Sequence, residues 1–66
     1  MKEKLQQYIN CELKNMKVWG LDVNSTTTRC YGATMAFMYA FPEEAKEIGR
    51  WWDDEIHPIF RELGAY

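Results

Sequence analysis

Residues 42–64, PEEAKEIGRWWDDEIHPIFRELG, carry the clearest helical pattern in the chain. The apolar side chains of this stretch recur every three or four residues, which places them along one side of a helix. They are Ala45, Ile48, Trp52, Ile56, Ile59 and Leu63, with Phe60 at the edge. Pro42 and the two glutamates after it suit a first helical turn, where proline is tolerated and carboxylates stabilise the positive end of the helix dipole. We therefore predict a helix over about 42–63.

Pro58 interrupts this pattern. Proline has no N–H group, so the hydrogen bond to the carbonyl of Asp54 cannot form. The apolar spacing nevertheless continues beyond Pro58 as far as Gly64. We therefore expect a kink near Pro58 rather than a break in the helix.

Two further segments predict helices. Residues 2–19 place an apolar arc on one side and stop before Gly20, a residue that favours helix ends. The arc comprises Leu5, Tyr8, Ile9, Leu13, Met16 and Trp19. The second helix is expected over about 25–41. It follows a linker in which Asn24 or Ser25 is the expected helix cap. The expected core face of this second helix comprises Cys30, Tyr31, Thr34, Met35, Phe37, Met38 and Phe41.

Three helices in 66 residues leave only short connections, which make neighbouring helices antiparallel. A β-hairpin over 21–31 is a local alternative, but that stretch lacks a turn dipeptide such as Asn-Gly. The sequence thus predicts an all-α fold, a small three-helix bundle that forms one domain over residues 1–66. No apolar run approaches the 18 residues of a membrane span, so we expect no membrane partner. The polar N-terminal residues resemble no secretory signal, so we expect a cytoplasmic protein.

Charge and motifs argue against several function classes. The net charge is −2, and residues 42–66 carry seven acidic side chains against three basic ones. A nucleic-acid-binding protein normally shows a basic face, so we expect no direct binding to nucleic acid. No nucleophile–base pair, phosphate-binding loop or paired-carboxylate motif is present, and a chain this small has little room for a pocket. We therefore expect no catalytic residue, no cofactor and no enzymatic activity.

Metal-ligating residues are sparse. Cys11, Cys30 and His57 are too few for a four-ligand zinc site. Asp53 and His57 lie four residues apart on one helix, which could contribute to a metal site. Lysine and arginine side chains share that arc, so a solvated charge network is the expected arrangement and no metal is expected. The two cysteines fall on different helix faces, so we predict two free thiols.

Trp51 lies on the wrong side of its helix for the core. On a regular helix it lies beside Glu44, Glu55 and Glu62, about 100° away from Trp52. One interpretation is an aromatic anchor surrounded by acids, which is typical of a binding hot spot. The other is that Trp51 folds over the edge of the bundle and shields the core.

The second helix has a face of small residues. Gly32, Ala36 and Ala40 recur every four residues, and Tyr39 lies beside them. This spacing lets two helix backbones approach closely, which indicates a self-association surface. The alternative is an outward-facing stripe of alanines that merely favours the helix.

Glu12 falls inside the apolar arc of the first helix. A buried carboxylate needs a partner, and Arg29 on the otherwise uncharged second helix is the obvious one, with a tyrosine hydroxyl as the next. We predict a structural ion pair between Glu12 and Arg29. The alternative is an acid held for chemistry or for a partner's cation.

These features favour a small non-enzymatic interaction protein. It would present the acidic and aromatic face of its third helix to a larger protein, as an inhibitor or regulator of the kind that phages and mobile elements encode. A homodimer is a further expectation. The alternative function is a homo-oligomer that binds a small ligand between subunits. Its pocket would be lined by methionine and tyrosine side chains, namely Tyr8, Met16, Tyr31, Met35, Met38 and Tyr39.

Overall fold

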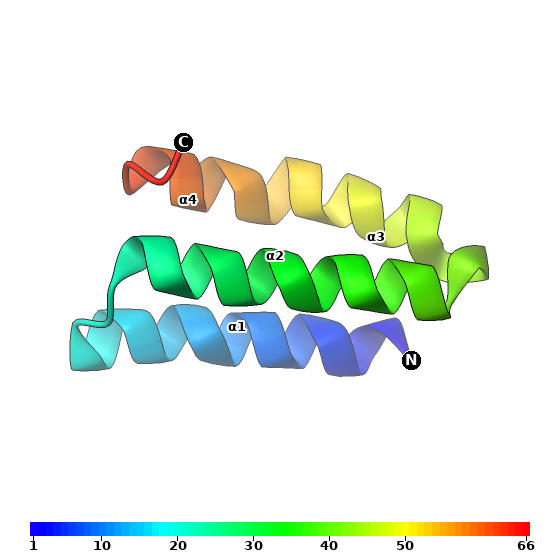
Figure 1. The fold of residues 1–66 in the computed structure, drawn as a ribbon, viewed down its shortest axis with the longest axis horizontal. Coiled ribbons are helices and arrows are strands. Elements are labelled where there is room, and N and C mark those ends of the chain that lie inside the picture. The colour runs from blue at the N-terminus through cyan, green and yellow to red at the C-terminus, as the bar shows by residue number, and fades with distance from the viewer.

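The computed structural model describes residues 1–66 and confirms an all-α fold of three helical segments without a β-strand (Figure 1). The first two are α1 (Lys2–Trp19) and α2 (Val23–Ala40). The third helix is a continuous series of four short elements. These are a 3-10 turn η1 (Pro42–Glu44), α3 (Ala45–Trp51), a π-helical segment η2 (Trp52–Ile56) and α4 (His57–Glu62). The segments run antiparallel, and α2 lies between α1 and the third helix.

The turn between α1 and α2 is closed by two helix caps. Gly20 adopts a left-handed conformation with φ 65°, and its N–H donates to the carbonyl of Met16. Asp22 caps α2, because its carboxylate accepts a hydrogen bond of 2.8 Å from the N–H of Ser25. Our expectation that Asn24 or Ser25 would be the cap was therefore wrong. The second helix begins at Val23, two residues earlier than expected.

The buried face of α2 differs from the expected one. The buried residues are small and mostly polar, namely Thr26, Thr27, Cys30 and Thr34. Tyr31 and Met35, which we expected in the core, are 49% and 47% exposed. Threonine tolerates burial here because its hydroxyl donates back to the preceding turn, as Thr34 does to the carbonyl of Cys30 at 2.8 Å. The interior therefore contains no unsatisfied polar side chain.

Large side chains of α1 and the third helix form most of the core. The nine buried hydrophobic residues are Leu5, Ile9, Leu13, Met16, Cys30, Ile48, Trp52, Ile56 and Phe60. Two members of the expected arc of α1 lie outside this core, since Tyr8 is 43% and Trp19 is 73% exposed. The C-terminal end of α1 projects beyond the other helices in Figure 1, so Trp19 has no neighbouring helix to cover it.

The π-helical segment sets the register of the third helix. Ile48, Trp52, Ile56 and Phe60 are all buried although they lie four residues apart. In a regular helix that spacing would rotate each side chain about 40° past the one before it. A π turn contains an extra residue, which reverses the accumulated rotation by about 100° and returns Phe60 to the core.

The expected interruption near Pro58 thus takes the form of a π turn that ends just before it. Pro58 lies in the first turn of α4, where its missing N–H removes little. The same register shift makes our placement of Leu63 in the core wrong, because Leu63 is exposed. Ile59 is half-buried beside the core.

Alanine substitutions at two positions test this register. Phe60→Ala removes a fully buried ring and should lower the free energy of unfolding by about 3–5 kcal/mol. Leu63→Ala removes an exposed side chain and should cost less than about 1 kcal/mol. Urea denaturation at one fixed protein concentration measures both. An equal loss in the two variants would mean that the third helix is regular through Pro58.

Candidate interaction surface

The third helix has two chemically different sides. Gly49 and Asp53 face α2, where they border a groove with Tyr31. Two residues along a helix amount to a rotation of about 200°, so Trp51 lies on the opposite side from both. That opposite side approaches the start of α1, where the N–H of Lys2 donates to the Glu44 carboxylate at 3.3 Å.

We call Glu44, Trp51 and Glu55 the Trp51 side. Trp51 is half-buried and packs against the core, so it is both a shield and a partly accessible ring. Glu55 is exposed, and Glu44 is half-buried. The sequence also placed Glu62 here, but the π turn lies between Trp51 and Glu62 and rotates the later residue away by about 100°. Glu62 is exposed on a neighbouring side of the helix.

A lysine of α1 balances part of this acidic side. The ammonium group of Lys2 forms an ion pair with Glu47, one helical turn before Trp51. The hydrogen bond to Glu47 raises the pKa of Lys2. Glu55 has no such partner, so its charge is available to another molecule.

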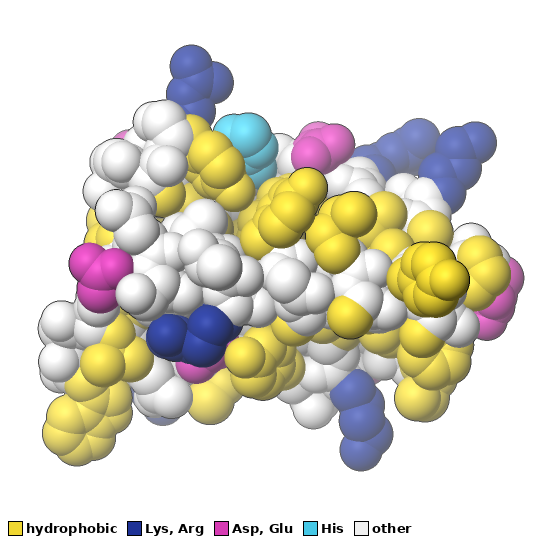
Figure 2. Space-filling model, in the orientation of Figure 1, with side chains coloured by type: hydrophobic (Ala, Val, Ile, Leu, Met, Phe, Trp, Pro, Cys, Tyr) yellow, Lys and Arg dark blue, Asp and Glu magenta, His cyan; other side chains and the backbone are white.

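The exposed side of α2 carries the predicted self-association residues. Gly32, Ala36, Tyr39 and Ala40 are all exposed, and we call these four residues the α2 face. Tyr31 and Met35 are also about half exposed, but they lie toward the third helix, where both border the groove beside Trp52. Figure 2 shows hydrophobic side chains gathered over the C-terminal half of α2, while most charged side chains stand at the edges of the view.

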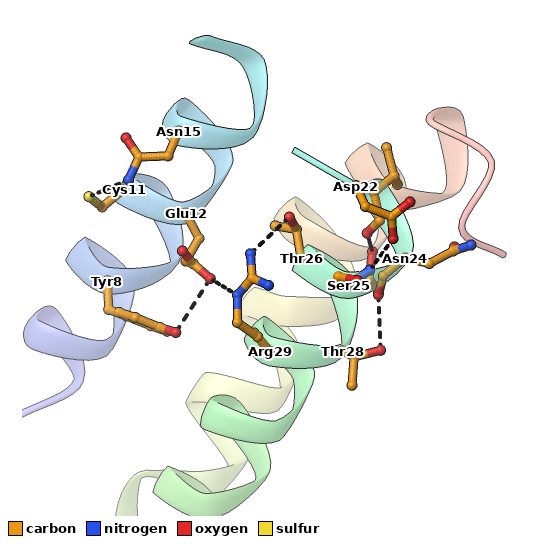
Figure 3. Close-up of polar contacts among 12 residues, drawn as sticks. Tyr8, Cys11, Glu12, Asn15, Asp22, Asn24, Ser25, Thr26, Thr28 and Arg29 are labelled. Atoms are coloured by element: carbon orange, nitrogen blue, oxygen red, sulfur yellow. Dashed lines mark hydrogen bonds and ion pairs between the residues drawn. The ribbon is translucent and has the colours of Figure 1, made fainter. Parts of the chain in front are cut away.

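The structure brings Glu12 and Arg29 together. Arg29 Nε lies 2.7 Å from Glu12 Oε2, and the same oxygen accepts a longer hydrogen bond of 3.4 Å from the Tyr8 hydroxyl (Figure 3). Arg29 Nη2 also donates to Thr26 Oγ1 at 3.2 Å. The bond to Glu12 raises the pKa of Arg29, while burial and the charge of Glu12 raise the pKa of Tyr8. The network ties α1 to α2, and its geometry is that of a structural ion pair.

Two shallow clefts border α2. The larger, of about 640 Å³, lies between the N-terminal half of α2 and Tyr66, whose ring stacks on His57 at 4.4 Å. The smaller, of about 220 Å³, is lined by Tyr31, Met35 and Met38 among others. The structure therefore gathers three of the six residues expected to line a ligand pocket, whereas Met16 is buried in the core.

Sequence reasoning missed Tyr31 and Met35 as surface residues. It assigned the larger side chains of α2 to the core, since large apolar residues are usually buried. The signal that could have located them is the run of threonines. Thr26, Thr27 and Thr34 can satisfy their own hydroxyls within the helix, so their side of α2 is as suitable for burial as an apolar one.

The cysteines are both free, and they differ in environment. Cys11 is exposed on α1, and Cys30 is buried on α2. Burial raises the pKa of the Cys30 thiol to about 11. No group of three or more histidine, cysteine or acidic side chains converges in a way that would hold a metal ion.

A double-mutant cycle tests the ion pair. Glu12→Gln and Arg29→Gln, singly and together, should give a coupling free energy of about 0.5–1 kcal/mol, because Arg29 is 45% exposed and water screens the pair. The coupling should fall in high salt. Additive effects of the two substitutions on the free energy of unfolding would mean that the contact contributes nothing.

The raised pKa of Cys30 predicts a pH dependence of stability. Above pH 9 the thiol of the unfolded chain loses a proton that the folded chain retains until about pH 11, so rising pH favours unfolding in this window. A shift of this size corresponds to about 2–3 kcal/mol. The loss between about pH 9 and 11 should be smaller in Cys30→Ala than in the wild type, measured by urea denaturation. An unchanged pH slope in Cys30→Ala would contradict the assignment to Cys30.

Comparison with known proteins does not assign a function to this chain. No helix has the length and apolar character required to cross a membrane. No family model, no curated protein and no solved structure matches the chain.

Proposed function

We propose that this chain is a small non-enzymatic interaction protein that binds a larger protein and acts as its inhibitor or regulator. The observation that carries the proposal is the amount of apolar surface left outside. Ten large hydrophobic side chains are exposed, one more than the nine residues of the core. A chain that exposes as many large apolar side chains as it buries would gain stability from a partner that covers some of them.

The Trp51 side supports binding of a basic protein surface. Trp51 already packs against the core, so its ring loses little conformational freedom when a partner covers the rest of it. Tryptophan is also among the residues that contribute most to protein interfaces. The carboxylates of Glu44 and Glu55 favour lysine or arginine on the partner and speed the encounter. A rigid helix side of this kind acts by occupying a groove on the larger protein.

Capture of binding partners from cells that naturally carry this chain tests the proposal. The wild type should retain a larger protein that Trp51→Ala and Glu55→Lys release, and raised salt should weaken retention. Trp19→Ala is the matched control, because Trp19 is 73% exposed on α1, away from the Trp51 side. Circular dichroism checks that each variant is folded. Retention of the same proteins by Glu55→Lys, Trp51→Ala and wild type would exclude the Trp51 side.

The small-ligand-binding homo-oligomer is a second candidate, favoured by the groove that Tyr31, Met35 and Met38 line. Its volume of about 220 Å³ is below the roughly 300–1,000 Å³ of typical small-molecule sites. A second subunit would have to supply the missing walls. This candidate therefore requires self-association, whereas the binding of a larger protein does not.

A further inference from the structure

We propose that the groove between α2 and the third helix binds a small quaternary ammonium ion of the choline type. Two aromatic rings form adjoining walls of this groove. The ring centroids of Tyr31 and Trp52 lie 5.8 Å apart, and the ring planes are inclined at 71°. The face of an aromatic ring attracts a cation, and rings that meet near a right angle are the walls from which proteins build such cation sites.

Asp53 supplies a negative charge at the same groove. Its side chain is exposed and takes part in none of the ion pairs of the structure. Arg50, the nearest basic residue in the sequence, borders a different cleft together with Glu43 and Glu47. No lysine or arginine lines the groove beside Asp53. The carboxylate therefore favours a cation over a neutral or anionic molecule.

The remaining walls favour a quaternary ammonium ion over a primary one. Met35 and Met38 line the groove with apolar, polarisable side chains. Thr34 is buried, and its hydroxyl already donates to the carbonyl of Cys30 at 2.8 Å. A primary ammonium ion would lose hydrogen bonds to water that these walls do not replace. A quaternary ammonium ion has no N–H group and loses none.

The size of the groove also indicates a small occupant. Its volume of about 220 Å³ is too small for a drug-sized ligand but sufficient for a choline-type ion within a single chain. A peptide would in addition need partners for its backbone, and the apolar walls offer few. Because the groove is open and Tyr31 is 49% exposed, we expect a dissociation constant in the millimolar range.

This site does not depend on the proposed larger partner. Trp51 lies on the opposite side of the third helix from the groove, so an ion bound beside Trp52 leaves it free. The site also requires no self-association. Absence of ion binding would therefore not affect the proposed function, and loss of protein binding at Trp51 would not affect the ion site.

Titration of the ¹⁵N-labelled chain with choline at constant ionic strength tests the site. The three tryptophans give separate indole N–H signals in an NMR spectrum, and Trp19→Phe and Trp51→Phe assign them by elimination. The Trp52 signal should shift saturably, whereas the Trp19 signal should stay in place because that ring lies at the end of α1. The control ligand is the neutral isostere of choline, in which a tert-butyl group replaces trimethylammonium. It should bind at least about tenfold more weakly.

Matched variants test the two kinds of wall. Tyr31→Leu removes the ring but keeps an apolar side chain, and Asp53→Asn removes only the charge. Each should raise the dissociation constant for choline at least about fivefold. Tyr39→Leu and Asp54→Asn make the same changes at exposed residues outside the groove and should leave it within about twofold of the wild type. Circular dichroism checks that each variant is folded.

Several results would overturn the proposal. One is a Trp52 signal that does not shift up to about 50 mM choline. Another is equal binding of choline and its neutral isostere, or of choline and methylammonium. Equal weakening by Asp53→Asn and Asp54→Asn would mean that the acidic third helix attracts cations without a site. A trimethyllysine peptide that binds more than about tenfold tighter than choline would make a protein side chain the occupant.

Discussion

The fold depends on the small buried face of α2. This helix lies between the other two, and it can lie close to both because its inward residues are threonine and cysteine rather than leucine or phenylalanine. The hydroxyl of Thr34 donates to the helix's own carbonyl, so burial of the polar group has little cost. The neighbours supply the volume, with Ile9 on one side and Trp52 and Phe60 on the other. The consequence is that the large side chains of α2 remain outside.

The π turn solves a second geometric problem. The apolar residues before and after the π-helical segment would fall on different faces of a regular helix. The extra residue of the π turn brings Ile48 and Phe60 onto one line. It also moves Glu62 away from Trp51, so the acidic side is shorter than a regular helix would make it. Segments of this type occur often at functional sites.

The character of two exposed surfaces follows from these two features. The α2 face is exposed because α2 turns its threonines inward. The Trp51 side faces away from the groove with α2, and Glu44 and Glu55 make it acidic. A protein of this size buries only about 60% of its unfolded surface, so its stability is marginal. Contacts with a second copy or a larger protein would add burial and raise the stability of the folded state. A partner that covered either surface would therefore also stabilise the fold.

The sequence by itself determined the helical segments, their antiparallel order and the partnership of Glu12 with Arg29. These follow from apolar periodicity, short connections and the cost of an unpaired carboxylate, which are local or pairwise properties. Only the tertiary structure decided which side of α2 is inside, that Phe60 replaces Leu63 in the core and that Trp19 is exposed. Periodicity gives the angle between side chains on one regular helix, but it does not give the closeness of neighbouring helices or an added residue in a turn. Those depend on how all three helices fill the same volume.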